Sequence, residues 1–155
     1  GSIALLYSAA GAAAFSRVTS LVLAAPHVFV EECCVEAIQG LTTDFASSTL
    51  RRGLHRLHGS QADATFAAWS GVWLSPAFRP WNCEAVLPEI ACPVLAFQGD
   101  RDPYGTGRQT EALVRGCPGE IEVVALAGCG HHPHRERREV FVERTTEFLR
   151  RWSER

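Results

Sequence analysis

An acidic residue and a histidine follow two consecutive apolar segments near the end of this chain. Asp102 comes shortly after the apolar run of residues 94–97, and His131 follows the apolar run of residues 121–126. A carboxylate can accept a hydrogen bond from one imidazole nitrogen and leave the other nitrogen to act as a base. An acid and then a histidine, each after a strand, is the order of the last two members of a hydrolytic triad.

The first member of such a triad is not found in the sequence. A serine in a Gly-x-Ser-x-Gly turn occurs nowhere in the 155 residues. Other roles for the two residues stay open: Asp102 could form a turn in Asp-Pro-Tyr-Gly, and His131 could be one of several loop histidines. Asp100 is a rival acid, for which we expect a local hydrogen bond within the turn.

A metal site is the next chemistry to weigh. Thiolate and imidazole suit zinc, and the chain offers Cys129, His131, His132 and His134. These side chains lie within one short loop, whereas structural zinc sites usually draw their ligands from two separated segments. We therefore expect no metal and no other cofactor, with zinc at the histidine loop as the weaker alternative.

Aromatic residues are concentrated in the middle of the chain. Trp69, Trp73 and Trp81 lie there together with Phe66 and Phe78. Packing within a helical core explains each of them separately. Together with His27, which follows a predicted strand, the three tryptophans are also candidates to line an apolar substrate pocket.

The elements that must position these residues follow from hydrophobic patterning. Residues 3–15 are apolar on every face and predict a buried helix, and residues 20–26 predict a strand covered on both faces. Helices follow at 32–40 and 43–58, and Ser60 is expected to cap another. After Pro93 the pattern alternates between strand and helix: strands at 94–97 and 121–126, a helix started by a capping box at 106–109, and a last helix at about 137–152.

This alternation predicts an α/β fold with about three parallel strands, flanking helices and a helical insertion. We expect residues 1–30 and 89–155 to form the sheet and its helices, and residues 31–88 to form the insertion. Three parallel strands leave an apolar edge uncovered, which is typical of part of a larger domain. Self-association through that edge is therefore expected as an interaction.

Composition excludes several classes of protein. The net charge is -2, and no basic stripe is present, so nucleic acid is not an expected partner. The longest apolar run is too short to cross a bilayer, so no membrane is expected either. Six scattered cysteines look like buried thiols, which favours a reducing, cytoplasmic compartment. Methionine is absent, so we expect residues before Gly1 to be missing.

With these motifs in view, the chain resembles the α/β-hydrolases, in particular esterase-like and carbon–carbon-bond hydrolases with a helical lid. The resemblance spans nearly the whole chain. It is carried by residues 1–7 (GSIALLY), 25–31 (APHVFVE), 98–106 (QGDRDPYGT) and 129–134 (CGHHPH). Arg101 and His132 depart from the residues usual in that family.

The resemblance implies that Asp102 is the acid and His131 the base, with Asp100 a non-catalytic turn residue. The family's serine would lie about three residues before Gly1, and residues 31–88 would form the lid. The expected function is the C-terminal part of a serine hydrolase that cleaves a small apolar ester or a related acyl or carbon–carbon bond. Loss of a nucleophile costs on the order of a millionfold in rate, so the chain alone is expected to be inactive. The alternative is a non-catalytic remnant or interaction module that pairs through its open sheet edge.

Overall fold

The computed structural model describes residues 1–11 and 18–153. It contains a parallel sheet of three strands. The strands are β1 (Leu21–Ala24), β2 (Val94–Gly99) and β3 (Ile121–Leu126), and β2 lies between the other two. In register, Ala24 pairs with Phe97 and Gly99 pairs with Leu126. The carboxyl ends of the strands therefore lie at one edge of the sheet, as the predicted α/β fold requires.

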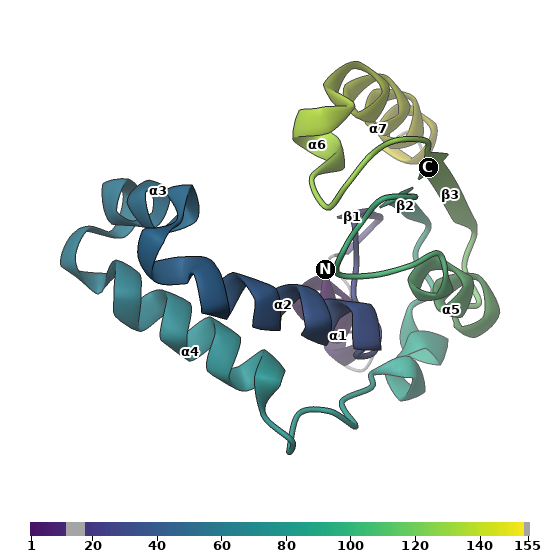
Figure 1. Ribbon diagram of the computed structural model, residues 1–155. Coiled ribbons are helices and arrows are strands. Elements are labelled where there is room, and N and C mark those ends of the chain that lie inside the picture. The colour runs from purple at the N-terminus through teal and green to yellow at the C-terminus, as the bar shows by residue number, and fades with distance from the viewer. Residues whose placement is uncertain (12–17, 154–155) are drawn as a thin grey trace. The chain divides into compact units, whose positions relative to one another are not determined.

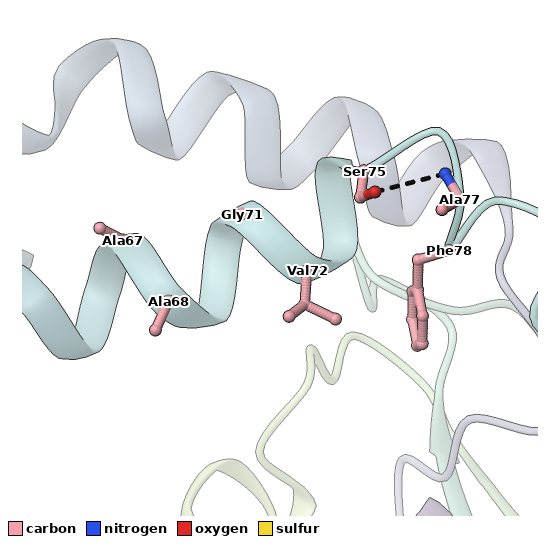
Figure 2. Close-up of a pocket in the computed structure, with 7 residues that line it drawn as sticks. All are labelled: Ala67, Ala68, Gly71, Val72, Ser75, Ala77 and Phe78. Atoms are coloured by element: carbon pink, nitrogen blue, oxygen red, sulfur yellow. Dashed lines mark hydrogen bonds between the residues drawn. The ribbon is translucent and has the colours of Figure 1, made fainter.

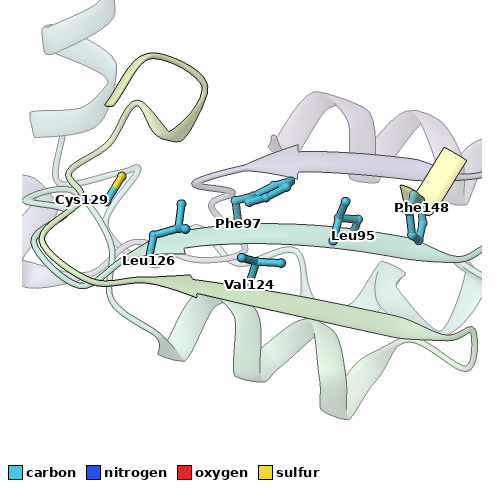
Figure 3. Close-up of a cluster of buried hydrophobic side chains, with 6 residues drawn as sticks. All are labelled: Leu95, Phe97, Val124, Leu126, Cys129 and Phe148. Atoms are coloured by element: carbon cyan, nitrogen blue, oxygen red, sulfur yellow. The ribbon is translucent and has the colours of Figure 1, made fainter. Parts of the chain in front are cut away.

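Side chains of β2 and β3 form the core against the last helix. Leu95 and Phe97 are fully buried, and Phe148 of α7 (Arg138–Ser153) packs with them, as Figure 3 shows. Burying each such side chain contributes roughly 1.5–3 kcal/mol. The helices α1 (Ser2–Gly11) and α5 (Arg108–Gly116) lie on the other side of the strands from α7 (Figure 1). A layer of helices on each side explains why β2 is buried along its whole length.

The chain divides into two compact units. One contains residues Gly1–Phe29 and Asn82–Arg155, and the other contains Val30–Trp81. The second unit is helical. Its elements are α2 (Glu32–Asp44), a 3-10 turn (Phe45–Ser47), α3 (Thr49–His58), a second 3-10 turn (Gly59–Gln61) and α4 (Ala62–Leu74). A third 3-10 helix (Glu84–Glu89) belongs to the first unit, although the sequence placed residues 82–88 in the insertion.

The predicted helix ends had different outcomes. Ser60 does not cap α4, because residues 59–61 form a 3-10 turn and Gln61 holds the cap position. The last predicted helix, at about 137–152, is confirmed as α7, and a short helix, α6 (Pro133–Glu136), precedes it with Arg137 between them in a non-helical conformation. The end of the first predicted helix, residues 12–15, lies outside the described residues.

The capping box at residues 106–109 is also wrong. The hydroxyl of Thr106 accepts from the N–H of Arg108, but the side chain of Gln109 turns inward and is fully buried. There it accepts from the N–H of Val28 and donates to the carbonyl of Phe29. Gln109 therefore fixes the segment after β1 instead of closing the first turn of α5.

Two further features concern the helices and the cysteines. No helix among the described residues is both long and apolar enough to span a bilayer. All six cysteines lie within the described residues, and none of them forms a disulfide. Cys34, Cys83, Cys117 and Cys129 are buried, as expected for structural thiols.

Candidate active site

The loops that follow β2 and β3 lie directly against each other. We call residues 100–107 the acid loop and residues 127–132 the histidine loop. The N–H of Arg101 donates to the carbonyl of Cys129 at 2.9 Å. At Gly99, where β2 ends, a Cβ atom would lie 2.1 Å from that same carbonyl oxygen. Only glycine permits this approach, which brings the two loops together.

The approach places Asp102 and His131 in contact. Nδ1 of His131 lies 2.9 Å from Oδ2 and 3.0 Å from Oδ1 of Asp102. The side chain of Asp102 is 1% exposed and that of His131 is 27% exposed. The pair is thus held with a buried acid and an imidazole that reaches the surface.

The charge state of Asp102 determines the tautomer of its partner. Burial raises the pKa of this carboxyl, but hydrogen bonds from His131, the N–H of Tyr104 and Gln98 outweigh burial and hold the pKa below its ordinary value. The carboxyl is therefore ionised at neutral pH and can only accept hydrogen bonds. Nδ1 of His131 must then carry a proton, which leaves Nε2 as the nitrogen that can act as a base.

Other side chains hold the histidine loop. The carboxylate of Glu136, in α6, accepts from the N–H groups of Gly130 at 2.7 Å and His132 at 3.0 Å, the residues on either side of His131. Asp100 accepts from the N–H of Gly128 at 2.7 Å. The local turn bond expected for Asp100 is therefore wrong, because its carboxylate bridges to the histidine loop. Sequence patterning did not single out Glu136, although its position three residues after Pro133 puts it in the first turn of α6.

His27 lies beside the pair. Its ring centroid is 5.7 Å from that of His131, and the ring centroid of Tyr104 is 4.8 Å from that of the same imidazole. The start of α1 reaches this place too: the hydroxyl of Ser2 donates to the carbonyl of His27 at 2.8 Å. A Cβ atom on Gly1 would lie 2.8 Å from Cα of Pro26, so the first residue packs closely on this segment.

The three tryptophans belong to the second unit. Trp73 and Trp81 pack with Phe78, and Trp69 packs with Phe66. That unit carries an open apolar groove of about 470 Å³. Figure 2 shows its lining, which comes from α4 and the segment after it: Ala67, Ala68, Gly71, Val72, Ser75, Ala77 and Phe78. The tryptophans are not among the lining residues, and their role in binding substrate stays a prediction.

Three histidines lie close together in the histidine loop and at the start of α6. His131, His132 and His134 form a row of rings in edge contact, with centroids 5.4 Å and 5.8 Å apart. Within residues 1–11 and 18–153 no group of three His, Cys, Asp or Glu side chains converges in a way that could hold an ion.

Comparison with known proteins places the fold. No protein-family model matches the sequence, and no curated protein matches it. Solved structures do match. NosK from Streptomyces actuosus has a TM-score of 0.69 at 21% identity, covering 96% of this chain and 65% of its own. An esterase from Pyrococcus furiosus has a TM-score of 0.62 at 18% identity, with 96% and 50% covered. An esterase from a Rhodococcus species has a TM-score of 0.63 at 20% identity, with 97% and 62% covered.

These matches confirm the predicted fold. The three parallel strands with flanking helices form part of an α/β-hydrolase fold. The chain spans between half and about two thirds of the length of these structures.

Proposed function

We propose that this chain is part of a serine hydrolase in which Asp102 is the acid and His131 the base. The contact between the Asp102 carboxylate and Nδ1 of His131, at the carboxyl ends of adjacent parallel strands, carries the proposal. In the catalytic cycle, Nε2 of His131 would take the proton of the nucleophile and later return it to the leaving group. Asp102 would keep the ring in the required tautomer and stabilise the imidazolium.

The nucleophile would come from the residues before Gly1. Gly1 packs on Pro26, Ser2 is hydrogen-bonded to the carbonyl of His27, and the ring of His27 contacts that of His131. Residues that precede α1 would therefore enter the space beside the imidazole. A serine at the turn into this helix could then meet Nε2, as in a nucleophile elbow.

A small apolar ester, or a related acyl or carbon–carbon bond, is the substrate class that we propose. Two of the three structures described above are esterases. The Val30–Trp81 unit, with its aromatic residues and apolar groove, would serve as the lid over the substrate. The six thiols, none of them in a disulfide, favour a reducing compartment such as the cytoplasm.

The experiment is an assay of the protein extended upstream of Gly1. We expect the reading frame before Gly1 to encode Gly-x-Ser-x-Gly, and the extended protein to hydrolyse p-nitrophenyl esters. His131→Ala should lower kcat by about 10⁴-fold or more. His134→Ala, in the same row of rings but without contact to Asp102, is the control and should keep kcat within about threefold. Full activity in His131→Ala would refute the assignment.

An interaction module is the second candidate. Val123 of the edge strand β3 is 39% exposed, and Ile3 of α1 is 83% exposed. Exposed apolar side chains on an edge strand and a helix favour association with another chain. If the extended protein shows no hydrolase activity, the interaction module is a better account of the function than the serine hydrolase.

A further inference from the structure

We propose that Gln98 is a positioning residue, whose side-chain amide holds the Asp102 carboxylate in the orientation that His131 requires. The inference rests on the proposed function, because it assigns a partner to the proposed acid. Gln98 is a polar residue in the otherwise apolar β2, and it is 5% exposed.

The geometry around the amide is unusual for a merely buried glutamine. The two hydrogens of Nε2 face three acceptors: Oδ2 of Asp102 at 3.1 Å, the carbonyl of Gly105 at 3.0 Å and, as the longest and shared contact, the carbonyl of Gly99 at 3.3 Å. All three partners are acceptors, so the amide nitrogen, and not the oxygen, must face them. Oε1 has no hydrogen-bond partner among the described residues. Leaving a buried acceptor unsatisfied is costly, so the donations from Nε2 determine how this side chain lies.

The donors to the carboxylate are divided between its two oxygens. Oδ1 accepts from the N–H of Tyr104 at 2.9 Å, and Oδ2 accepts from Gln98. Nδ1 of His131 lies within hydrogen-bond distance of both oxygens. Two fixed donors, one on each oxygen, prevent the carboxylate from rotating about its Cβ–Cγ bond. Without Gln98, His131 is the one remaining donor to Oδ2. The carboxylate then loses one of the contacts that fix the orientation of its plane.

A purely structural role is the competing explanation. The same amide binds the carbonyls of Gly99 and Gly105 and thereby closes the acid loop. Both roles predict that replacing Gln98 destabilises the fold. Only the positioning role predicts a change in the ionisation of Asp102 itself.

The test is a ¹³C NMR titration of the Asp102 carboxyl in this chain, with His131 as the titratable ring that faces it. In Gln98→Met the pKa of Asp102 should rise, because the ionised form loses a donor. The expected change in its acid dissociation constant is on the order of threefold to tenfold. In the isosteric Gln98→Glu the pKa should rise further, because a second carboxylate would adjoin the first.

Gln109→Met is the matched control. Gln109 is also a fully buried glutamine of the first unit, but it binds the main chain of Val28 and Phe29 and not Asp102. We expect it to lose stability and to leave the titration of Asp102 unchanged. If Asp102 titrates in a folded Gln98 variant as it does in the wild type, the inference is overturned.

A further variant separates this inference from the proposed function. His131→Ala removes the imidazole donor and must raise the pKa of Asp102 if the two residues form a pair. If His131→Ala has this effect and the Gln98 variants do not, the positioning role fails while the acid–base pair stands. If His131→Ala has no effect, the pair does not form, and the proposed function fails with it.

Discussion

The ionised carboxylate of Asp102 is buried beneath an imidazole that remains partly accessible. Burial alone would raise the pKa of this carboxyl, and three hydrogen-bond donors reverse the effect. A fixed carboxylate gives His131 one tautomer and one ring orientation. If the acid loop and the histidine loop were flexible, His131 would lose this single tautomer and this single ring orientation. The groups that hold the two loops therefore matter as much as the pair itself.

Glu136 allows a test of whether such groups hold the histidine loop in place. Glu136→Ala removes the acceptor for the N–H groups of Gly130 and His132, so both should exchange with solvent roughly tenfold faster. Hydrogen–deuterium exchange followed by NMR measures this directly. Glu139→Ala, also an exposed glutamate, is the control and should leave both amides protected. Unchanged exchange in Glu136→Ala would mean that the loop is held by other contacts.

The same residue gives a pH dependence with a definite sign. Hydrogen bonds from Gly130 and His132 hold the pKa of Glu136 below its ordinary value. A carboxylate whose pKa is depressed by folding contributes stability above its unfolded pKa, and this contribution is lost as the pH falls through the folded pKa. The difference in unfolding free energy between wild type and Glu136→Ala should therefore be constant near neutral pH and shrink in acid. Urea denaturation at a series of pH values measures it.

Among the elements, the end of β2 has the tightest constraint. The acid loop and the histidine loop touch because Gly99 has no Cβ atom to separate them. Adjacent parallel strands bring their carboxyl ends to one edge, but this alone does not set the spacing of the loops that follow. The absence of a side chain at Gly99 sets the distance between the acid loop and the histidine loop.

Gly99→Ala should therefore damage the site. The new methyl group would lie 2.1 Å from the carbonyl oxygen of Cys129, so the loops must move apart, at a cost of about 1–3 kcal/mol or more. Gly107→Ala is the matched control, because a Cβ atom there would meet nothing within 4 Å. The unfolding free energy of Gly107→Ala should stay within about 1 kcal/mol of the wild-type value. Equal denaturation midpoints for the two variants would show that the contact is not a constraint.

At the level of the whole molecule, the chain exposes surfaces that a complete domain usually covers. Ile3 and Tyr7 of α1 are 83% and 67% exposed, and β1 and β3 each pair with β2 alone among the described strands. The solved structures of the same fold are longer than this chain. We expect the extended protein to cover these surfaces and the chain alone to associate through them.

Light scattering coupled to size-exclusion chromatography tests this expectation. The average mass of the chain should rise with concentration, and Ile3→Lys should reduce the rise. Leu57→Lys replaces a side chain that is 80% exposed in the other unit and should have no such effect. A monomer at every concentration would argue against association and against the interaction-module function.

The sequence by itself determined the fold class, because the period of apolar residues depends only on neighbours along the chain. Apolar runs at 94–97 and 121–126 predicted the strands β2 and β3, and Asp102 and His131 were found because each follows one of them. The matching structures confirmed this fold. The errors at Ser60 and Gln109 both came from local capping rules. A 3-10 turn replaced the cap at Ser60, and tertiary hydrogen bonds drew the side chain of Gln109 inward.

Only the tertiary structure decided which groups surround the pair. Gln98 lies one residue beyond the strand predicted at 94–97, and Glu136 lies in a segment rich in charged residues. Their partners are the carboxylate of Asp102 in one case and two backbone N–H groups in the other. Such hydrogen bonds form where two loops come into contact in the folded chain. The spacing of residues along the sequence does not predict these contacts.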